Sequence, residues 1–284
     1  MLTLRNVSKI VGKHTVLEDV SETFEPGERV SLFGPSGSGK SMLLSLLIAA
    51  ETPTSGTVEI DGVDLRRIPA PILQIFRRRI GMMFSDLKLL ADRTVAENIA
   101  YPLEVCGIAD AVIQPRISEL LEHVGLSLRA HTPAAELTRS EQVKVALARA
   151  LASKPLILFV DDPFRMLDRA EIGAFLELLH RSKTTEMTML CTTSDPWIAD
   201  QMAGRVLQLD NGRIVPRSQA ETSSTEAPLQ EPQRQSRSEH ARPAPKTKAS
   251  FKEEIPLGIL ADKPSKQVKA TNTPRKIKVT SIGS

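Results

Sequence analysis

The spacing of apolar and polar residues along this chain changes repeatedly between alternation and a helical period of three to four residues. Alternating stretches and short, wholly apolar runs predict β-strands, and the longer periodic stretches predict α-helices. The predicted strands are Leu2–Val7, Val16–Phe24, Arg29–Phe33, Thr57–Ile60, Val63–Leu65, Ile80–Phe84, Leu156–Val160, Met187–Cys191, Val206–Leu209 and Ile214–Val215. The predicted helices are Ser38–Ala49, Ala70–Arg79, Thr94–Ala100, Val112–Val124, Ser140–Ala152, Ala170–Arg181 and Pro196–Met202.

The order of these elements predicts an α/β core, because strands and helices alternate through most of the chain. The apolar run Leu156–Val160 is typical of a parallel strand that is buried on both faces. Residues 88–155 have few strand signals and predict a helical region. Spacing alone leaves open whether this region is a separate lobe inserted into the core or part of one domain.

The composition changes at about Pro216. Residues 216–284 contain 8 of the 19 prolines and 13 basic against 7 acidic residues, so this segment is basic while residues 1–215 are mildly acidic. Such a segment buries too little apolar surface to offset the entropy lost on ordering, and we predict a disordered, basic, Pro/Ser-rich tail. Within it, residues 251–260 are either a docking patch or a chance apolar cluster. Residues 263–278 carry six basic residues but no aromatic one, which does not predict a specific nucleic-acid site.

The two cysteines, Cys106 and Cys191, make no disulfide framework and lack metal-ligand spacing, so we expect buried neutral thiols. The N-terminus has no apolar signal core, and the longest apolar run, residues 42–50, is far shorter than the roughly 20 residues of a membrane-spanning helix. These features predict a cytoplasmic protein whose link to a membrane is made by a partner.

One segment carries a specific chemical signature. The sequence Gly34-Pro35-Ser36-Gly37-Ser38-Gly39-Lys40-Ser41 lies between a predicted strand and a predicted helix and matches the phosphate-binding loop. Its glycines let backbone N–H groups point inward at phosphate, and the helix N-terminus adds a positive dipole end. Lys40 is expected to reach the β- and γ-phosphates and Ser41 to ligate Mg²⁺. The alternative is a Gly/Ser-rich turn with a chance lysine.

A second acidic element follows the buried strand Leu156–Val160. Asp161 is predicted to hold Mg²⁺ through water, opposite Ser41. A second carboxylate, Asp162, follows directly. The alternative is that the two carboxylates form a helix N-cap pair.

These motifs and their layout resemble those of ABC ATPases over residues 1–215, and in detail the bacterial cell-division ATPases of the FtsE family. Residues 77–84, 89–103 and 141–150 carry the similarity, although lipoprotein-release and amino-acid-import ATPases share much of it. The resemblance implies an ABC-type P-loop NTPase fold. It comprises a RecA-like mixed-sheet core, an antiparallel β subdomain and an α-helical subdomain near residues 88–155. It also implies ATP and Mg²⁺ as cofactors.

The resemblance further implies a dimer that sandwiches two ATP molecules, each between one subunit's phosphate loop and the other's signature motif. A homodimer and a heterodimer with an intact paralogue both remain open. The implied partner is an FtsX-like or other permease-type membrane protein, which would hold the chain at the inner face of the cell membrane. Five residues are candidates for receiving it, and each has an alternative role as core or solvated loop: Asp86, Leu87, Leu89, Leu90 and Tyr101.

The chain departs from the family pattern at the signature motif, where LSGGE aligns with Leu137-Thr138-Arg139-Ser140-Glu141. Both glycines are missing. Arg139 places a long side chain where the family's backbone approaches the γ-phosphate of the opposite ATP, and Thr138 keeps a hydroxyl.

Five further departures surround the nucleotide. Asp162 stands for the glutamate that polarises the attacking water, Ser194 for the switch histidine and Ser85 for the glutamine that senses Mg²⁺ and the γ-phosphate. Val11 aligns with the aromatic residue that stacks on adenine, and Met42 with a threonine that contacts the α-phosphate.

The phosphate-binding residues are therefore retained while the γ-phosphate-sensing and water-activating residues are changed. We expect a subunit that binds ATP or ADP and hydrolyses it slowly or not at all. Two alternatives remain: a working ATPase that energises an ABC transporter with Asp162 as its base, and a scaffold in which the loop is a relic.

Overall fold

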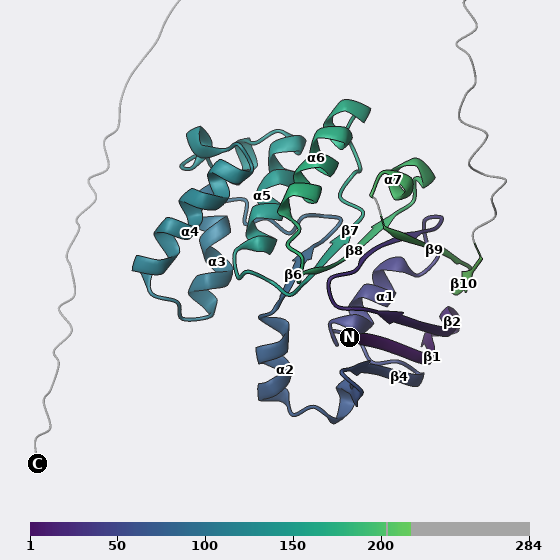
Figure 1. The fold of residues 1–284 in the computed structure, drawn as a ribbon. Helices are drawn as coiled ribbons and strands as arrows, with labels where there is room; N and C mark the ends of the chain where they lie inside the picture. The colour runs from purple at the N-terminus through teal and green to yellow at the C-terminus, as the bar shows by residue number, and fades with distance from the viewer. Residues whose placement is uncertain (203, 217–284) are drawn as a thin grey trace, which may run out of the picture. The chain divides into compact units, whose positions relative to one another are not determined.

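The computed structural model describes residues 1–202 and 204–216, so the predicted tail from residue 217 onward lies outside the described residues. Figure 1 shows the arrangement of the elements. The strands are β1 (Leu2–Val11), β2 (His14–Phe24), β3 (Arg29–Phe33), β4 (Ser55–Ile60), β5 (Val63–Asp64), β6 (Ile80–Met83), β7 (Ile157–Asp161), β8 (Thr188–Thr193), β9 (Arg205–Asp210) and β10 (Arg213–Val215). The helices are α1 (Lys40–Leu47), α2 (Ala70–Arg77), α3 (Val95–Val105), α4 (Asp110–His123), α5 (Arg139–Leu151), α6 (Arg169–Ser182) and α7 (Pro196–Gln201).

Two sheets organise the described chain. The larger has the order β10-β9-β3-β8-β7-β6, in which β9, β3, β8, β7 and β6 run parallel and β10 pairs antiparallel with β9. The smaller is antiparallel, with the order β2-β1-β4-β5. The predicted mixed-sheet core and antiparallel β subdomain are therefore confirmed.

The helix that follows the phosphate loop, α1, is buried between the two sheets. Leu43, Leu44, Leu46 and Leu47 are all within the core and pack with residues of both sheets. A helix enclosed in this way holds its first turn rigidly, which fixes the position of Lys40 and Ser41.

The C-terminal end of α1 is closed by Arg77. Its Nε donates to the Ile48 carbonyl at 3.1 Å, and its Nη2 donates to the Ala49 carbonyl at 2.5 Å. Helices end with unsatisfied carbonyls that need such donors. The local sequence predicted only that Arg77 lies in a helix, because a cap supplied across the fold has no local signature.

The strand β7 separates two apolar clusters. Leu158 and Val160 face a cluster formed with the helices, whereas Phe159 between them faces the cluster around α1. This alternation within a wholly apolar run is what a parallel strand buried on both faces requires, as predicted. Cys191 of β8 is fully enclosed, and burial raises the pKa of its thiol, in agreement with the expected neutral state.

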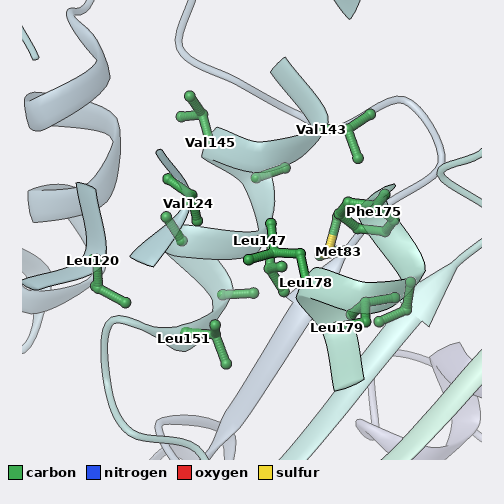
Figure 2. Packing of buried hydrophobic residues seen from close by; sticks show 14 of the residues in the cluster. Met83, Leu120, Val124, Val143, Val145, Leu147, Leu151, Phe175, Leu178 and Leu179 are labelled. Atoms are coloured by element: carbon green, nitrogen blue, oxygen red, sulfur yellow. The ribbon is translucent and has the colours of Figure 1, made fainter. Parts of the chain in front are cut away.

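The helical side of the larger sheet contains α3, α4, α5 and α6. Figure 2 shows side chains from α4, α5, α6 and β6, among them Leu147, Phe175, Leu178 and Met83, gathered around a shared interior. Helices α3 and α5 both begin at a capping box, with Thr94 and Thr138 as the N-cap residues. Helices α3 to α5 occupy the region that was predicted to be helical.

The helix α3 extends beyond its predicted end at Ala100, through Pro102 to Val105. A proline inside a helix normally argues for an end, but the tertiary contacts override that preference here. At the start of the helix, the buried side chain of Asn98 bonds the backbone of Leu90, Arg93 and Thr94. It thereby holds the preceding loop against α3. Among the described residues, no helix is long and apolar enough to cross a membrane.

Candidate nucleotide-binding site

A hollow of about 370 Å³ opens where β3, β6, β7 and β8 reach their carboxyl ends. In parallel α/β sheets this edge is the usual place for ligands. The lining residues are Val16, Ser36, Gly37, Gly39, Lys40, Ser41, Met42, Ser85, Asp161, Asp162, Arg165 and Ser194. Five segments that are far apart in the sequence therefore meet at one site.

The loop between β3 and α1 has the tight geometry that its glycines allow. Gly39, the N-cap of α1, has φ of 107°, a region that L-residues with a side chain rarely adopt. A Cβ atom at Gly39 would lie 2.7 Å from the Val16 carbonyl oxygen and 2.8 Å from Leu17 Cδ2. The glycine at this position is thus required by both conformation and space.

Lys40 lies inside this loop, with 7% of its surface exposed. Its Nζ donates to the carbonyls of Gly34 at 2.6 Å and Pro35 at 2.9 Å. Burial lowers the pKa of Lys40, and the nearby charges of Asp162 and Asp161 oppose that shift.

The loop also contains an unsatisfied polar atom. The hydroxyl of Ser38 is buried and has no hydrogen-bond partner within the described part of the chain. A buried polar group without a partner is costly unless a ligand or water supplies one. The loop of backbone amides, the enclosed ammonium group and this hydroxyl suit an oxygen-rich anion such as the phosphates of a nucleotide.

Ser41 and Asp161 meet as the sequence predicted. The Ser41 hydroxyl donates to Asp161 Oδ1 at 3.0 Å, and the hydroxyl of Thr192 donates to the same oxygen at 2.8 Å. No helix begins at Asp161 or Asp162; α6 begins at Arg169 and is capped by Asp168, so the N-cap alternative is wrong. Thr192 was not predicted, because its side chain is one of six buried positions in β8 without a distinguishing pattern.

A hydroxyl and a carboxylate are oxygen ligands of the kind that Mg²⁺ prefers, together with phosphate oxygens and water. Within residues 1–202 and 204–216 there is no cluster of three His, Cys, Asp or Glu residues that could hold a metal ion. The pair Ser41 and Asp161 therefore suits an ion that arrives with a phosphate ligand and completes its coordination there.

Asp162 has an unusual backbone and an altered acidity. Its φ is 39°, in the left-handed region, and its Oδ2 accepts a hydrogen bond from the Ser194 hydroxyl at 3.2 Å. Burial raises the pKa of Asp162, while the Ser194 hydrogen bond and the charge of Lys40 oppose that shift. The two residues predicted to replace the water-polarising glutamate and the switch histidine are thus in direct contact.

The side chain of Arg139 points into its own chain. Its Nη2 donates to the Ser85 carbonyl at 3.2 Å, and its Nε donates to the Arg165 carbonyl at 3.4 Å. Burial lowers the pKa of Arg139, and the charge of Asp86 opposes this. Arg139 therefore connects the N-terminus of α5 to two segments that border the hollow.

The other residues of the predicted signature motif serve the start of α5. The Thr138 hydroxyl accepts from the Glu141 amide at 3.3 Å, and the Thr138 amide donates to Glu141 Oε2 at 2.9 Å, which forms the capping box. The Thr138 hydroxyl also donates to Glu141 Oε2 at 3.1 Å. Ser140 lies half-buried in the first turn of α5. The hydroxyl retained at Thr138 is thus already engaged within the chain.

Two predicted positions lie elsewhere than expected. Val11, at the end of β1, is 47% exposed and does not line the hollow, whereas Val16 of β2 does. Leu87 was a candidate for receiving a partner, but it is 2% exposed and belongs to the core. In contrast, Arg165 was not predicted and lines the hollow.

Comparison with known proteins places this geometry in a family. The sequence model of the ABC transporter family matches residues 17–165, which include the phosphate loop and the Asp161-Asp162 pair. The chain belongs to the ABC transporter family. As a member, it is similar to the cell division ATP-binding protein FtsE of Mycobacterium tuberculosis, with 40% identity over 217 residues that cover 76% of this chain and 94% of that protein.

The methionine import ATP-binding protein MetN of Haemophilus influenzae is 39% identical over 220 residues. That match covers 76% of this ABC protein but only 64% of MetN. The dimeric structure of MJ0796, a bacterial ABC transporter cassette, superposes with a TM-score of 0.69 at 30% identity and covers 76% of this chain and 97% of its own. A post-hydrolysis structure of the same cassette, bound to ADP and Pi, gives the same TM-score and identity and covers 77% and 98%.

These relatives confirm the predicted ABC ATPase fold and family. ATP taken up with Mg²⁺ is the cofactor of this family, and the hollow holds the residues that suit both. The similar identities to FtsE and MetN leave the transport or division role to be argued separately.

Proposed function

We propose that this chain is an FtsE-like nucleotide-binding subunit that binds Mg²⁺-ATP and hydrolyses it slowly or not at all. The proposal rests on one observation: in the same hollow, a complete phosphate loop faces an opposite wall, formed by Ser85, Asp162 and Ser194, that departs from the family pattern. Lys40, Ser41 and Asp161 have the arrangement that suits a Mg²⁺-phosphate ligand. Asp162, Ser194 and Ser85 take the positions at which the family has longer or imidazole side chains.

Slow hydrolysis is expected because the Asp162 side chain is too short to hold the attacking water as a glutamate would. Asp162 is one methylene shorter than glutamate and is already hydrogen-bonded to Ser194. A misplacement near 1 Å of a catalytic group can reduce the rate about 100-fold. The Ser194 hydroxyl carries no positive charge for the γ-phosphate, unlike an imidazolium. ATP would then act mainly by stabilising one state of a subunit pair, which requires only binding.

The FtsE-like assignment is supported by the extent of the similarity. This chain spans 94% of FtsE but about two thirds of MetN, so FtsE matches the length of the similar region better. We assign residues 1–215 to the ATP-binding domain, with a helical subdomain near residues 88–155. An FtsX-like membrane partner would then hold a homodimer or heterodimer at the cytoplasmic face of the membrane. The near-equal identity to MetN supports one alternative, the ATPase subunit of an amino-acid importer.

A groove beside the hollow suits the membrane partner. It has a volume of about 400 Å³ and lies between β6, α3 and α5, with Tyr101, Val105 and Arg149 among its lining residues. Tyr101 is 41% exposed and Val105 is 64% exposed, so the groove offers apolar surface for packing against another protein. Tyr101 is the predicted partner residue that best fits this groove.

The nucleotide part of the proposal is tested by calorimetric titration of the full chain with Mg²⁺-ATP, followed by steady-state phosphate release. We expect micromolar or tighter binding with turnover far below the typical enzyme value of about 10 per second. Asp162→Glu should raise phosphate release without strengthening binding. Absence of binding would favour the scaffold alternative, and rapid release by the unmodified chain would contradict slow hydrolysis.

The partner is tested by purifying the native complex from membranes and identifying the co-purifying membrane protein. Tyr101→Asp and Val105→Asp should each lose the partner while nucleotide binding is retained. Val112→Asp, on an apolar residue of α4 that is exposed but not in the groove, is the matched control. An importer permease in the complex would replace the FtsX-like assignment by the MetN-like one.

A further inference from the structure

One positively charged side chain in the hollow belongs neither to the phosphate loop nor to the site residues that the family resemblance implies. Among its described lining residues only Lys40 and Arg165 carry a positive charge. Lys40 belongs to the phosphate loop, whereas Arg165 follows β7 and shares the opposite wall with Asp162. Its side chain is exposed, and it forms no ion pair within 4 Å in the described part of the chain. Its charge does act on the neighbouring Asp162, where it opposes the rise in pKa that burial causes.

The backbone next to Arg165 is anchored in the core on its N-terminal side. The preceding residue, Phe164, is buried in the core and meets the ring of Phe175 edge to face, with 6.0 Å between centroids. The following residue, Met166, has φ of 67° and directs its side chain into solvent. Because Asp162 is also in the left-handed region, the segment makes two sharp changes of direction within five residues.

Arg139 adds a further restraint on the backbone at Arg165. Its guanidinium group donates to the Arg165 carbonyl and to the Ser85 carbonyl, so one side chain connects α5, the end of β6 and the segment after β7. A backbone restrained in this way holds its side chain near one position. The guanidinium group of Arg165 therefore lines the hollow, and a ligand that binds it orders little additional backbone.

The wall that holds Asp162 lacks the positive charge of a switch histidine, and Arg165 supplies a positive charge there. The position aligned with the switch histidine is the neutral Ser194, and the backbone of Ser85 is bound to Arg139. A triphosphate differs from a diphosphate by one further phosphoryl group, which adds negative charge and acceptor oxygens at the end of the chain. An unpaired guanidinium group at that end favours the longer ligand, since it forms forked hydrogen bonds with phosphate.

From this geometry we propose that Arg165 contacts the terminal phosphate of ATP in its own chain and that Arg139 is its positioning residue. The proposal rests on the nucleotide binding proposed above and assigns the discrimination between ATP and ADP to one side chain. Arg139, which stands where the family signature has a glycine, thus has a role within its own chain.

The proposal is tested by calorimetric titrations of the full chain with ADP and with the β,γ-imido analogue of ATP, both with Mg²⁺. In Arg165→Gln the affinity for the analogue should fall by roughly tenfold, as expected for loss of a charged hydrogen bond, while the affinity for ADP changes little. Arg165→Lys should retain part of the preference because it keeps the charge but loses the fork. Arg169→Gln is the matched control: this arginine lies nearby, over the Trp197 ring at 4.3 Å, but outside the hollow.

The positioning role is tested by a double-mutant cycle. Arg139→Ala should reduce the preference for the triphosphate analogue over ADP in the unmodified chain and have no further effect when Arg165 is already glutamine. If Arg165→Gln leaves the preference unchanged, or weakens both ligands equally, the proposal is overturned while nucleotide binding stands. If the unmodified chain binds neither ligand, the proposed function fails and this inference with it.

Discussion

The two walls of the nucleotide hollow differ in how much of the family pattern they retain. On one wall, the loop after β3 keeps its glycines, buries Lys40 and brings Ser41 to Asp161. On the other wall, Ser85, Asp162 and Ser194 are shorter than the family residues with which the resemblance aligns them, and Asp162 is bonded to Ser194. Because the walls are built from different segments, the residues for phosphate binding can persist while those for turnover change.

The difference also appears in how each wall is stabilised. The phosphate loop leads into α1, which is enclosed by two sheets and closed by Arg77. The opposite wall depends on side-chain contacts that cross segments, such as those of Arg139 with the carbonyls of Ser85 and Arg165. Four changes test this comparison, and the first should have the largest effect.

Lys40→Ala removes the one buried cation of the binding wall. We expect the affinity for Mg²⁺-ATP to fall by about 100-fold or more, because charged hydrogen bonds to phosphate are lost in a site shielded from water. Calorimetric titration measures this, and Lys88→Ala, outside the hollow and paired with Asp86, is the control. Unchanged affinity in Lys40→Ala would remove the basis for assigning this wall to nucleotide binding.

The combined change Ser85→Gln, Asp162→Glu and Ser194→His restores the family residues on the opposite wall. We expect phosphate release to rise by about tenfold, a fraction of what a well-placed general base contributes. The affinity for ADP should stay within about twofold, because the phosphate loop is untouched. If turnover does not rise although the variant folds and binds, other residues limit the reaction and the assignment of slow hydrolysis to these three is wrong.

Arg77→Ala removes the cap of α1 and should act on stability. Loss of two hydrogen bonds to half-buried carbonyls costs about 1 to 2 kcal/mol, which corresponds to a melting temperature lower by about 2 to 8 °C for a domain of this size. Arg78→Ala should change it less, because the side chain of Arg78 makes no hydrogen bond or ion pair among the described residues and its backbone bond to Gln74 is kept. Equal shifts in the two variants would contradict the capping role.

Asp162→Asn should stabilise the protein slightly at neutral pH. Burial raises the pKa of Asp162 in the folded state, so folding is favoured when this carboxyl is protonated. The native chain therefore loses this contribution as the pH rises through the folded-state pKa, and an uncharged asparagine avoids the loss.

The pH dependence separates two causes of this stabilisation. The difference in melting temperature between Asp162→Asn and the unmodified chain should shrink as the pH falls toward 4, near the pKa of an unfolded aspartate. Asparagine also tolerates a φ of 39°, and any part of the gain from that preference should not vary with pH. Asp86→Asn, at an exposed position, is the control; a difference that grows on acidification would reverse the stated sign.

Much of this protein was determined by local sequence. Alternation and apolar runs located every strand, and the glycine-rich loop between β3 and α1 identified the phosphate site, because both follow from the periods of regular structure and from glycine's freedom. The closeness of Ser41 and Asp161 was predicted because a phosphate loop and an acidic residue at the end of a buried strand hold Mg²⁺ together.

Only the tertiary structure decided the contacts between distant segments. Arg77 caps a helix 28 or 29 residues away, Thr192 bonds Asp161, and Arg139 turns inward to Ser85 and Arg165. Leu87, for which a partner surface and the core were both open, is buried in the core. A local pattern specifies the conformation of a segment but not which neighbour its side chains meet, because that choice depends on how the whole chain packs.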